Sequence, residues 1–232
     1  VAMRRLIAGV IHRQANGVLL DPYANAFYRD PVFGHWKADV TVMLPGIHER
    51  KWELDSPAYF LRLSHGYWNA TGDTSPFDPV WQRAVAAVFA LLRVEQAATD
   101  DKGTVISPYS FEREGAPHES LPCGGRGLPS KNCGLIRCGF RPSDDLVAFP
   151  FLVPANAMMA VALRDIAPLL DLLSCPSLAV EARALSSEIS QALETHALVQ
   201  HPRHGEIWAY EVDGFGGANL MDDANIPSLI SL

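Results

Sequence analysis

The sequence predicts an all-α protein in which helical hairpins form a barrel, and four observations support this prediction. About six segments carry apolar residues at helical spacing, long loops join them, and few stretches alternate as strands do. Acidic residues recur where the loops meet the expected helix starts, at Glu53 and Asp55, Asp144 and Asp145, Asp213, and Asp222 and Asp223. In such a barrel the N-termini of the inner helices converge at one mouth, and two-layer packing buries the apolar stripes.

Composition restricts the classes of partner. The 232 residues are 48% hydrophobic and 19% charged, which is typical of a globular domain. The net charge of −7 and the lack of a basic stripe exclude a nucleic-acid phosphate partner. Proline or charge interrupts the longest apolar runs, so we expect no membrane span.

The cysteines do not predict a metal site. Cys123, Cys133 and Cys138 lie in one glycine-rich loop at spacings of ten and five, and the fourth is Cys175. No CxxC pair or histidine at ligand spacing accompanies them, and no EF-hand loop is present. A disulfide in the loop and free thiols both remain open, and we expect neither a metal nor another cofactor.

The first half of the chain predicts three helices. The first runs from Met3 to about Gln14, where Asn16-Gly17 is expected to end it. An amphipathic segment follows Asp55-Ser56-Pro57 and ends near Thr71-Gly72. Asp78-Pro79 begins the clearest helix, whose apolar stripe we assign to core packing; the stripe is Trp81, Val85, Val88 and Leu92.

The second half begins with a short extended segment over 103–111 and a long loop over 112–138, a length typical of functional or mobile loops. One helical stripe then runs over 159–173, where Pro168 should kink or split it, and another over 178–192. Residues 206–215 alternate like a strand or hairpin, so we expect a short β-hairpin near 206–216. Residues 219–230 resemble a further acidic helix entrance.

The stretch Gly139-Phe140-Arg141-Pro142-Ser143-Asp144-Asp145 is the most informative. Pro142 prevents a smooth helix here, Ser143 is a good N-cap, and a helix dipole favours acids in the first turn. The stretch therefore predicts either a well-capped helix start or a helix mouth at which Asp144 or Asp145 donates or accepts a proton.

Carboxylates and aromatic residues in the loops indicate a sugar site. Trp36, Trp52, Trp208 and Tyr210 are candidates for stacking on sugar rings, and Asp39, Asp55, Asp213, Asn219, Asp222 and Asn225 for binding hydroxyls. Glycoside hydrolysis requires two carboxyl groups on opposite sides of the bond. Glu49, Arg50 and Glu53 form either one rim of this site or a salt-bridged helix end.

Other chemistries find less support. The chain has no GxSxG elbow and no HExxH motif. Gly124-Gly125-Arg126-Gly127 follows a loop and not a strand, so it is a poor phosphate cradle. His118 lies in the long loop and is a candidate ligand contact, whereas His12 and His196 lie in expected helices and are assigned structural roles.

Seven ordered stretches resemble glycoside hydrolase family 125, the exo-acting α-1,6-mannosidases (also described as meiotically up-regulated gene 157-type proteins). The stretches are 21–27, 49–56, 107–111, 139–145, 151–156, 209–216 and 220–225. The resemblance implies one partial catalytic domain over residues 1–232, with the fold of an incomplete (α/α)6 barrel. It also implies an inverting mechanism without a metal, and removal of non-reducing-end α-1,6-linked mannose from a mannose-containing oligosaccharide or glycan.

The resemblance also implies roles for residues. The general acid is expected in the motif Arg141–Asp145, with Asp145 preferred over Asp144. Substrate binding is expected from Arg141, Asp55, Glu53, Trp52, Asp39, Tyr210, Asp213, Asp222, Asp223 and Asn225.

The general base is expected to be a glutamate beyond Asn225 and past the end of this chain, and the family's first helices are expected before its start. The alternative is therefore a catalytically impaired fragment that acts at most as a mannoside-binding remnant. A third reading is a polysaccharide lyase on the same barrel, which would need a tyrosine or histidine base and often Ca²⁺.

Overall fold

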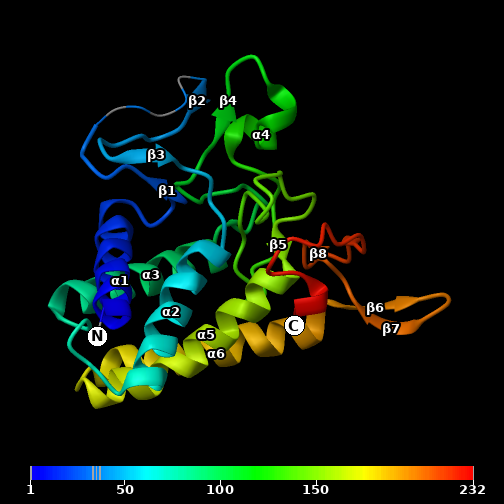
Figure 1. Cartoon of the computed structure of the whole chain (residues 1–232). Helices are drawn as coiled ribbons and strands as arrows, with labels where there is room; N and C mark the ends of the chain where they lie inside the picture. Colours follow the sequence, from blue (N-terminus) through cyan, green and yellow to red (C-terminus); the bar gives the residue numbers. More distant parts are fainter. Residues whose placement is uncertain (1, 33, 35, 37, 232) are drawn as a thin grey trace.

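A computed structural model describes residues 2–32, 34, 36 and 38–231. Five longer helices pack against one another, and a layer of loops with small sheets covers their upper ends (Figure 1). The helices are α1 (Ala2–Leu20), α2 (Asp55–Thr71), α3 (Pro79–Gln96), α5 (Val153–Leu172) and α6 (Pro176–His196), together with the short α4 (Pro122–Gly125) and the 3₁₀ turns η1 (Pro117–Glu119) and η2 (Leu229–Ser231).

The strands are short and belong to four small sheets. Their bounds are β1 (Ala26–Phe27), β2 (Asp39–Val40), β3 (Ile47–Glu49), β4 (Glu112–Arg113), β5 (Phe151–Leu152), β6 (Leu198–His201), β7 (Gly205–Trp208), β8 (Glu211–Val212) and β9 (Ala218–Asn219). Antiparallel pairs join β1 to β3, β2 to β4 and β6 to β7, and β8 lies between β5 and β9.

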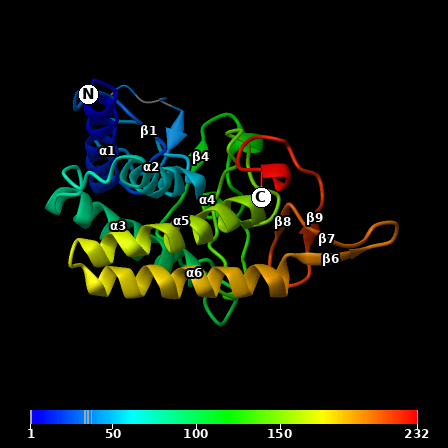
Figure 2. The same ribbon diagram turned by 60° about the horizontal axis from the view of Figure 1, so that its bottom comes forward.

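The helices pack mainly in pairs. Helices α5 and α6 form an antiparallel hairpin along one side of the molecule (Figure 2), α2 packs on α5, and α1 packs on α3. This helical architecture confirms the all-α prediction and agrees with an incomplete (α/α)6 arrangement, because the helices of the described residues do not close a ring.

Helix α3 forms as the sequence predicts. The Asp78 carboxylate accepts hydrogen bonds from the backbone N–H groups of Val80 and Trp81, both at 2.9 Å, and Pro79 occupies the first helical position. The predicted stripe from Trp81 to Leu92 is fully buried. Local capping and helical periodicity therefore determine this element.

Helix α5 is long and apolar enough to meet the length and composition criteria for a membrane span. However, 72% of its apolar window is buried inside the molecule, where it packs against α2 and α6. We attribute its apolar character to this central place in the core.

Three helix boundaries differ from the predictions. Helix α1 continues past Asn16-Gly17 to Leu20. Gly17 lies on a buried face of this helix, where an added Cβ would be 3.0 Å from the Phe27 ring. That glycine permits close packing and does not end the helix. Helix α5 is one unbroken helix, because Pro168 lies near its C-terminus and removes only a late backbone hydrogen bond.

The third boundary is the expected helix start at Ser143-Asp144-Asp145, which is wrong. This segment is a turn in which Asp144 has a φ of 68°, and α5 begins only at Val153. A left-handed residue cannot belong to a regular α-helix, so Ser143 caps no helix here.

The C-terminal predictions also need correction. The hairpin comprises β6 and β7 over 198–208, and β8 leaves it to pair with β5 and β9. Residues 219–228 form a strand end and turns, with only the 3₁₀ turn η2 after them. The four cysteines are free, so the disulfide alternative is not realised.

Candidate active site

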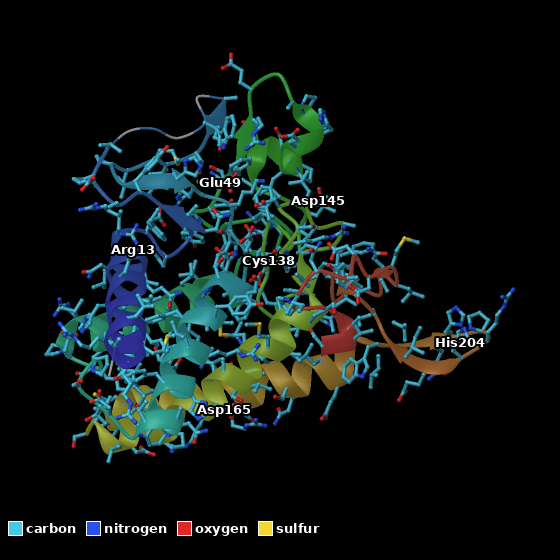
Figure 3. All side chains as sticks on the ribbon, viewed as in Figure 1. Arg13, Glu49, Cys138, Asp145, Asp165 and His204 are labelled. Atoms are coloured by element: carbon cyan, nitrogen blue, oxygen red, sulfur yellow. The ribbon has the colours of Figure 1, made fainter. Side chains whose placement is uncertain are left out.

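Asp144 and Asp145 lie at the tip of a tight turn in the loop-rich layer, where Figure 3 labels Asp145. The backbone N–H of Arg141 donates to the carbonyl of Asp145 at 2.8 Å, and that of Asp144 donates to the carbonyl of Arg141 at 3.0 Å. Both aspartates are exposed. The turn therefore presents two adjacent carboxyl groups to solvent on an ordered backbone.

Glu211 holds this turn in place from the interior of the protein. Its side chain is fully buried, and its Oε1 accepts a hydrogen bond from Arg141 Nε at 2.6 Å. Its Oε2 accepts from the backbone N–H of Ala148 at 3.1 Å and of Phe149 at 3.4 Å, and from Asn219 Nδ2 at 3.1 Å. One carboxylate thus ties together both ends of the aspartate loop and strand β9.

A second set of polar residues comes from the end of β3, the segment after it, and Asn25 before β1. Lys51 Nζ lies 3.4 Å from Asp144 Oδ1 and donates to the Asp144 carbonyl at 3.1 Å. Asn25 Nδ2 donates to Glu49 at 3.1 Å and to Glu53 at 3.4 Å. These contacts bring segment 49–53 against the Asp144 side of the turn, and they favour the site-rim interpretation over a solvated helix end.

Glu53 and Asp55 are buried carboxyl groups beside Asp144. Burial, reinforced by the negative charges of Asp55 and Asp144, raises the pKa of Glu53 to about 9. Burial also raises the pKa of Asp55 to about 6, and its Oδ1 lacks a hydrogen-bond partner among the described residues. Glu53 is therefore a neutral acid at pH 7, able to donate a hydrogen bond to a sugar oxygen.

The raised pKa of Glu53 predicts a pH-dependent stability. Between the ordinary glutamate pKa of 4.5 and the raised pKa of about 9, the folded state retains a proton that the unfolded chain loses, so stability falls as pH rises. Asp55 contributes in the same direction only up to about pH 6. We expect Glu53→Gln to flatten the fall in the free energy of unfolding between pH 6.5 and 9, as measured by urea denaturation at several pH values. An equally steep fall in the variant would contradict this assignment.

Tyr109 supports the backbone of segment 50–52. Its buried hydroxyl donates to the Arg50 carbonyl at 2.9 Å and accepts from the Trp52 N–H at 2.9 Å. The Trp52 carbonyl in turn accepts from the N–H groups of Gly139 and Phe140 at 3.0 and 3.1 Å. This chain of hydrogen bonds holds the rim segment against the start of the aspartate loop.

We expect Tyr109→Phe to destabilise the protein by about 1–3 kcal/mol, because it leaves two buried backbone groups without this hydroxyl partner. Tyr59→Phe is the control: its hydroxyl donates to the Ile226 carbonyl at 3.2 Å at an exposed position, and the expected loss is below about 0.5 kcal/mol. Urea denaturation of both variants measures the difference. Equal losses would refute the supporting role.

The other side of the turn faces the C-terminal loop. The Ser143 hydroxyl lies 3.1 Å from Asp145 Oδ2 and 2.9 Å from Asp223 Oδ2, and it can donate its one hydrogen to either. Burial and the Asp223 carboxylate raise the pKa of Tyr210. The Arg141 guanidinium lies 5.4 Å from the centroid of the Tyr210 ring. Ser143 therefore links Asp145 to Asp223, and Asp223 lies beside Tyr210.

Comparison with known proteins identifies the family of this chain. The sequence model of the family described as metal-independent alpha-mannosidase (GH125) matches residues 1–232. The chain belongs to the GH125 family.

Two similar proteins support this assignment. The meiotically up-regulated gene 157 protein of Schizosaccharomyces pombe is 37% identical over 240 residues, which cover 98% of this chain and 47% of that protein. A Streptococcus pneumoniae metal-independent alpha mannosidase, solved in a non-productive complex with α-1,6-mannobiose, matches with a TM-score of 0.91 and 37% identity, over 98% of this chain and 53% of that one. The chain spans about half the length of each relative.

The structure groups part of the predicted GH125 site. Arg141, Asp144, Asp145, Tyr210 and Asp223 lie around the turn, and Glu53 and Asp55 adjoin Asp144.

The remaining predicted residues have other surroundings. Trp52 is only 1% exposed and donates its indole N–H to the Arg137 carbonyl at 2.9 Å, so its buried ring cannot stack on a sugar. Asp213 accepts hydrogen bonds from Phe215 and Gly217 N–H, and Asp222 from Ala224 and Leu229 N–H, so both shape their loops. Asp39 pairs with Arg113, and Asn225 is exposed.

Sequence reasoning missed Glu211, Lys51 and Asn25 as site residues. Glu211 lies in a stretch that alternates like a strand, and its partner Arg141 is 70 residues away. A buried charge on one face of a strand was the available signal. In the part of the chain that the structure describes, no group of three or more His, Cys, Asp or Glu side chains could hold a metal ion.

Proposed function

We propose that this chain belongs to a glycoside hydrolase that removes α-1,6-linked mannose from the non-reducing end of mannose-containing glycans with inversion of configuration. The observation that carries the proposal is the ordered turn with Asp144 and Asp145, anchored to Glu211, in a chain whose GH125 relative binds α-1,6-mannobiose. The activity and its linkage specificity are inferred from that relative and from the chemistry of the carboxyl groups.

In this mechanism Asp145 protonates the oxygen between the terminal mannose and the leaving sugar. The C1–O bond breaks as a water molecule, activated by a second carboxylate, attacks C1 from the opposite face. The water loses a proton to that base, and β-mannose leaves. Inverting enzymes hold the two carboxyl groups roughly 6.5–9.5 Å apart to admit the water.

Glu53, Asp55 and Arg141 are proposed to bind the terminal mannose. The protonated carboxyl group of Glu53 offers a donor for sugar hydroxyls, and Asp55 Oδ1, which has no hydrogen-bond partner among the described residues, offers an acceptor. A site whose buried polar groups bind specific sugar hydroxyls discriminates strongly against sugars that lack those hydroxyls.

Linkage specificity tests this proposal. We expect the protein expressed from its complete gene to release mannose from α-1,6-mannobiose faster than from the α-1,2- and α-1,3-linked isomers. The 232-residue chain alone tests the alternative of a mannoside-binding remnant, by calorimetric titration with α-1,6-mannobiose. Binding by the chain without mannose release by the complete protein would favour the remnant.

A further inference from the structure

Lys51 binds the peptide group that precedes Asp145. Its Nζ donates to the carbonyl of Asp144 at 3.1 Å and lies 3.4 Å from Asp144 Oδ1. That carbonyl belongs to the planar peptide bond that joins Asp144 to Asp145. The next carbonyl, that of Asp145 itself, accepts from the Arg141 N–H at 2.8 Å. The peptide groups before and after the Asp145 Cα are therefore both held, which restricts the direction in which its carboxyl group leaves the backbone.

The backbone of Asp144 needs such a contact. Its φ of 68° lies in the left-handed region, which residues other than glycine rarely adopt and which persists where the surroundings hold it. Core packing does not hold it, because 58% of the Asp144 side chain is exposed. Among the described residues, Lys51 is the one cation within ion-pair distance of Asp144. The ammonium thus contacts both the carbonyl and the carboxylate of the residue with the unusual conformation.

Lys51 is itself held in place. Its side chain is only 9% exposed, and its Nζ lies 3.6 Å from Glu49 Oε1 and 5.4 Å from the centroid of the Phe140 ring. Asn25 contacts the same two residues: its Oδ1 accepts from the Lys51 N–H at 3.1 Å, and its Nδ2 donates to Glu49 Oε2 at 3.1 Å. The ammonium therefore occupies a fixed position beside the turn.

Glu49, which Figure 3 labels in the loop-rich layer, extends this network to two small sheets. Its Oε1 lies 3.8 Å from Arg113 NH2, and Arg113 Nε lies 2.7 Å from Asp39 Oδ1. The charges alternate in sign along the series Asp39, Arg113, Glu49, Lys51 and Asp144. Each buried charge in it has a neighbour of opposite sign, as burial of a charge requires.

We propose that Lys51 is a positioning residue for the general acid, and that it orients Asp145 through the peptide group between Asp144 and Asp145. This inference rests on the proposed function. A small displacement of a reacting group lowers the rate strongly, so loss of the ammonium should slow the step in which Asp145 donates its proton. The effect should then depend on how much the leaving group needs that proton.

The first test uses Lys51→Met in the protein expressed from its complete gene, because Met keeps an apolar stem beside Phe140 and removes the charge. We expect kcat for α-1,6-mannobiose to fall roughly tenfold, with KM changed less. For 2,4-dinitrophenyl α-mannoside, whose leaving group departs without protonation, we expect a fall of less than about twofold. Lys102→Met, at an exposed position, is the matched control and should change neither value.

A double variant tests whether Lys51 acts through the acid. In an Asp145→Asn background, Lys51→Met should lower mannobiose hydrolysis further by less than about twofold, because the group that it positions is already absent. A further loss as large as in the unsubstituted background would show that Lys51 acts independently of Asp145, and would overturn the proposal.

The other outcomes separate this proposal from the proposed function. Equal losses on both substrates, or no loss on mannobiose, would overturn the positioning role and leave the mannosidase activity standing. If urea denaturation shows that Lys51→Met does not fold, Glu49→Gln replaces it, since it removes the anion beside Lys51 and keeps an oxygen for Asn25; we expect the same substrate contrast, at roughly threefold. If the unsubstituted protein releases mannose from neither substrate, the proposed function itself is wrong.

Discussion

Replacing Asp145 with Asn is expected to lower kcat/KM for α-1,6-mannobiose by about 10²–10⁴-fold, the usual contribution of a general acid. The amide keeps the hydrogen-bond contact with Ser143 but cannot protonate the leaving oxygen. The loss should shrink for 2,4-dinitrophenyl α-mannoside, whose leaving group departs without protonation. Steady-state kinetics on both substrates measure the effect.

Asp144→Asn is the matched control for this prediction. Asp144 lies 3.4 Å from Lys51 Nζ, whereas no cation of the described residues lies within ion-pair distance of Asp145. The ion pair holds the Asp144 carboxylate against Lys51, so we assign the contact with the leaving oxygen to Asp145. If kcat/KM for α-1,6-mannobiose falls more in Asp144→Asn than in Asp145→Asn, and the loss shrinks with 2,4-dinitrophenyl α-mannoside, then Asp144 and not Asp145 is the general acid.

Glu211→Gln is expected to have the second largest effect. It removes the charge that pairs with Arg141 beneath the aspartate turn, and breaking a buried ion pair costs about 3 kcal/mol at the low end of the usual range. Because the turn is then held less firmly, kcat for α-1,6-mannobiose should fall roughly 10- to 100-fold, with KM changed less. Urea denaturation and steady-state kinetics measure the two effects.

Glu181→Gln is the matched control, since Arg93 Nε lies 2.6 Å from Glu181 in a similar pair between α3 and α6. Both side chains are more than a third exposed, and Arg93 keeps Glu188 and Gln96 as partners. We expect a loss below about 1 kcal/mol and unchanged kinetics. Equal kinetic losses in the two variants would show that activity does not depend specifically on the ion pair between Glu211 and Arg141.

The parts of the fold that local chemistry determines could be predicted from the sequence. Asp78 and Pro79 begin α3 because a cap and a preset φ act within one helical turn. Gly17 misled the prediction because its role depends on Phe27, which packs on it from outside the helix. The aspartate turn was mistaken for a helix start because Ser-Asp-Asp has the same local preferences in both settings.

The candidate site could be predicted only in part. Arg141, Asp144, Asp145 and Asp223 carry chemistry that the motifs display, and the structure brings them together. Trp52 was predicted to stack on a sugar, but it lies in the core, where its indole N–H donates a hydrogen bond to the Arg137 carbonyl. The role of Glu211 depends on contacts across the fold, which no spacing in the sequence reveals.

Proton NMR of α-1,6-mannobiose hydrolysis tests most directly whether the Asp145 turn belongs to an inverting mannosidase. The spectrum of the anomeric protons is followed from the first minutes, for the protein expressed from its complete gene and for its Asp145→Asn variant. We expect β-mannose to accumulate before mutarotation, and we expect the variant not to produce it. Early α-mannose, or no mannose from the unsubstituted protein, would contradict this expectation.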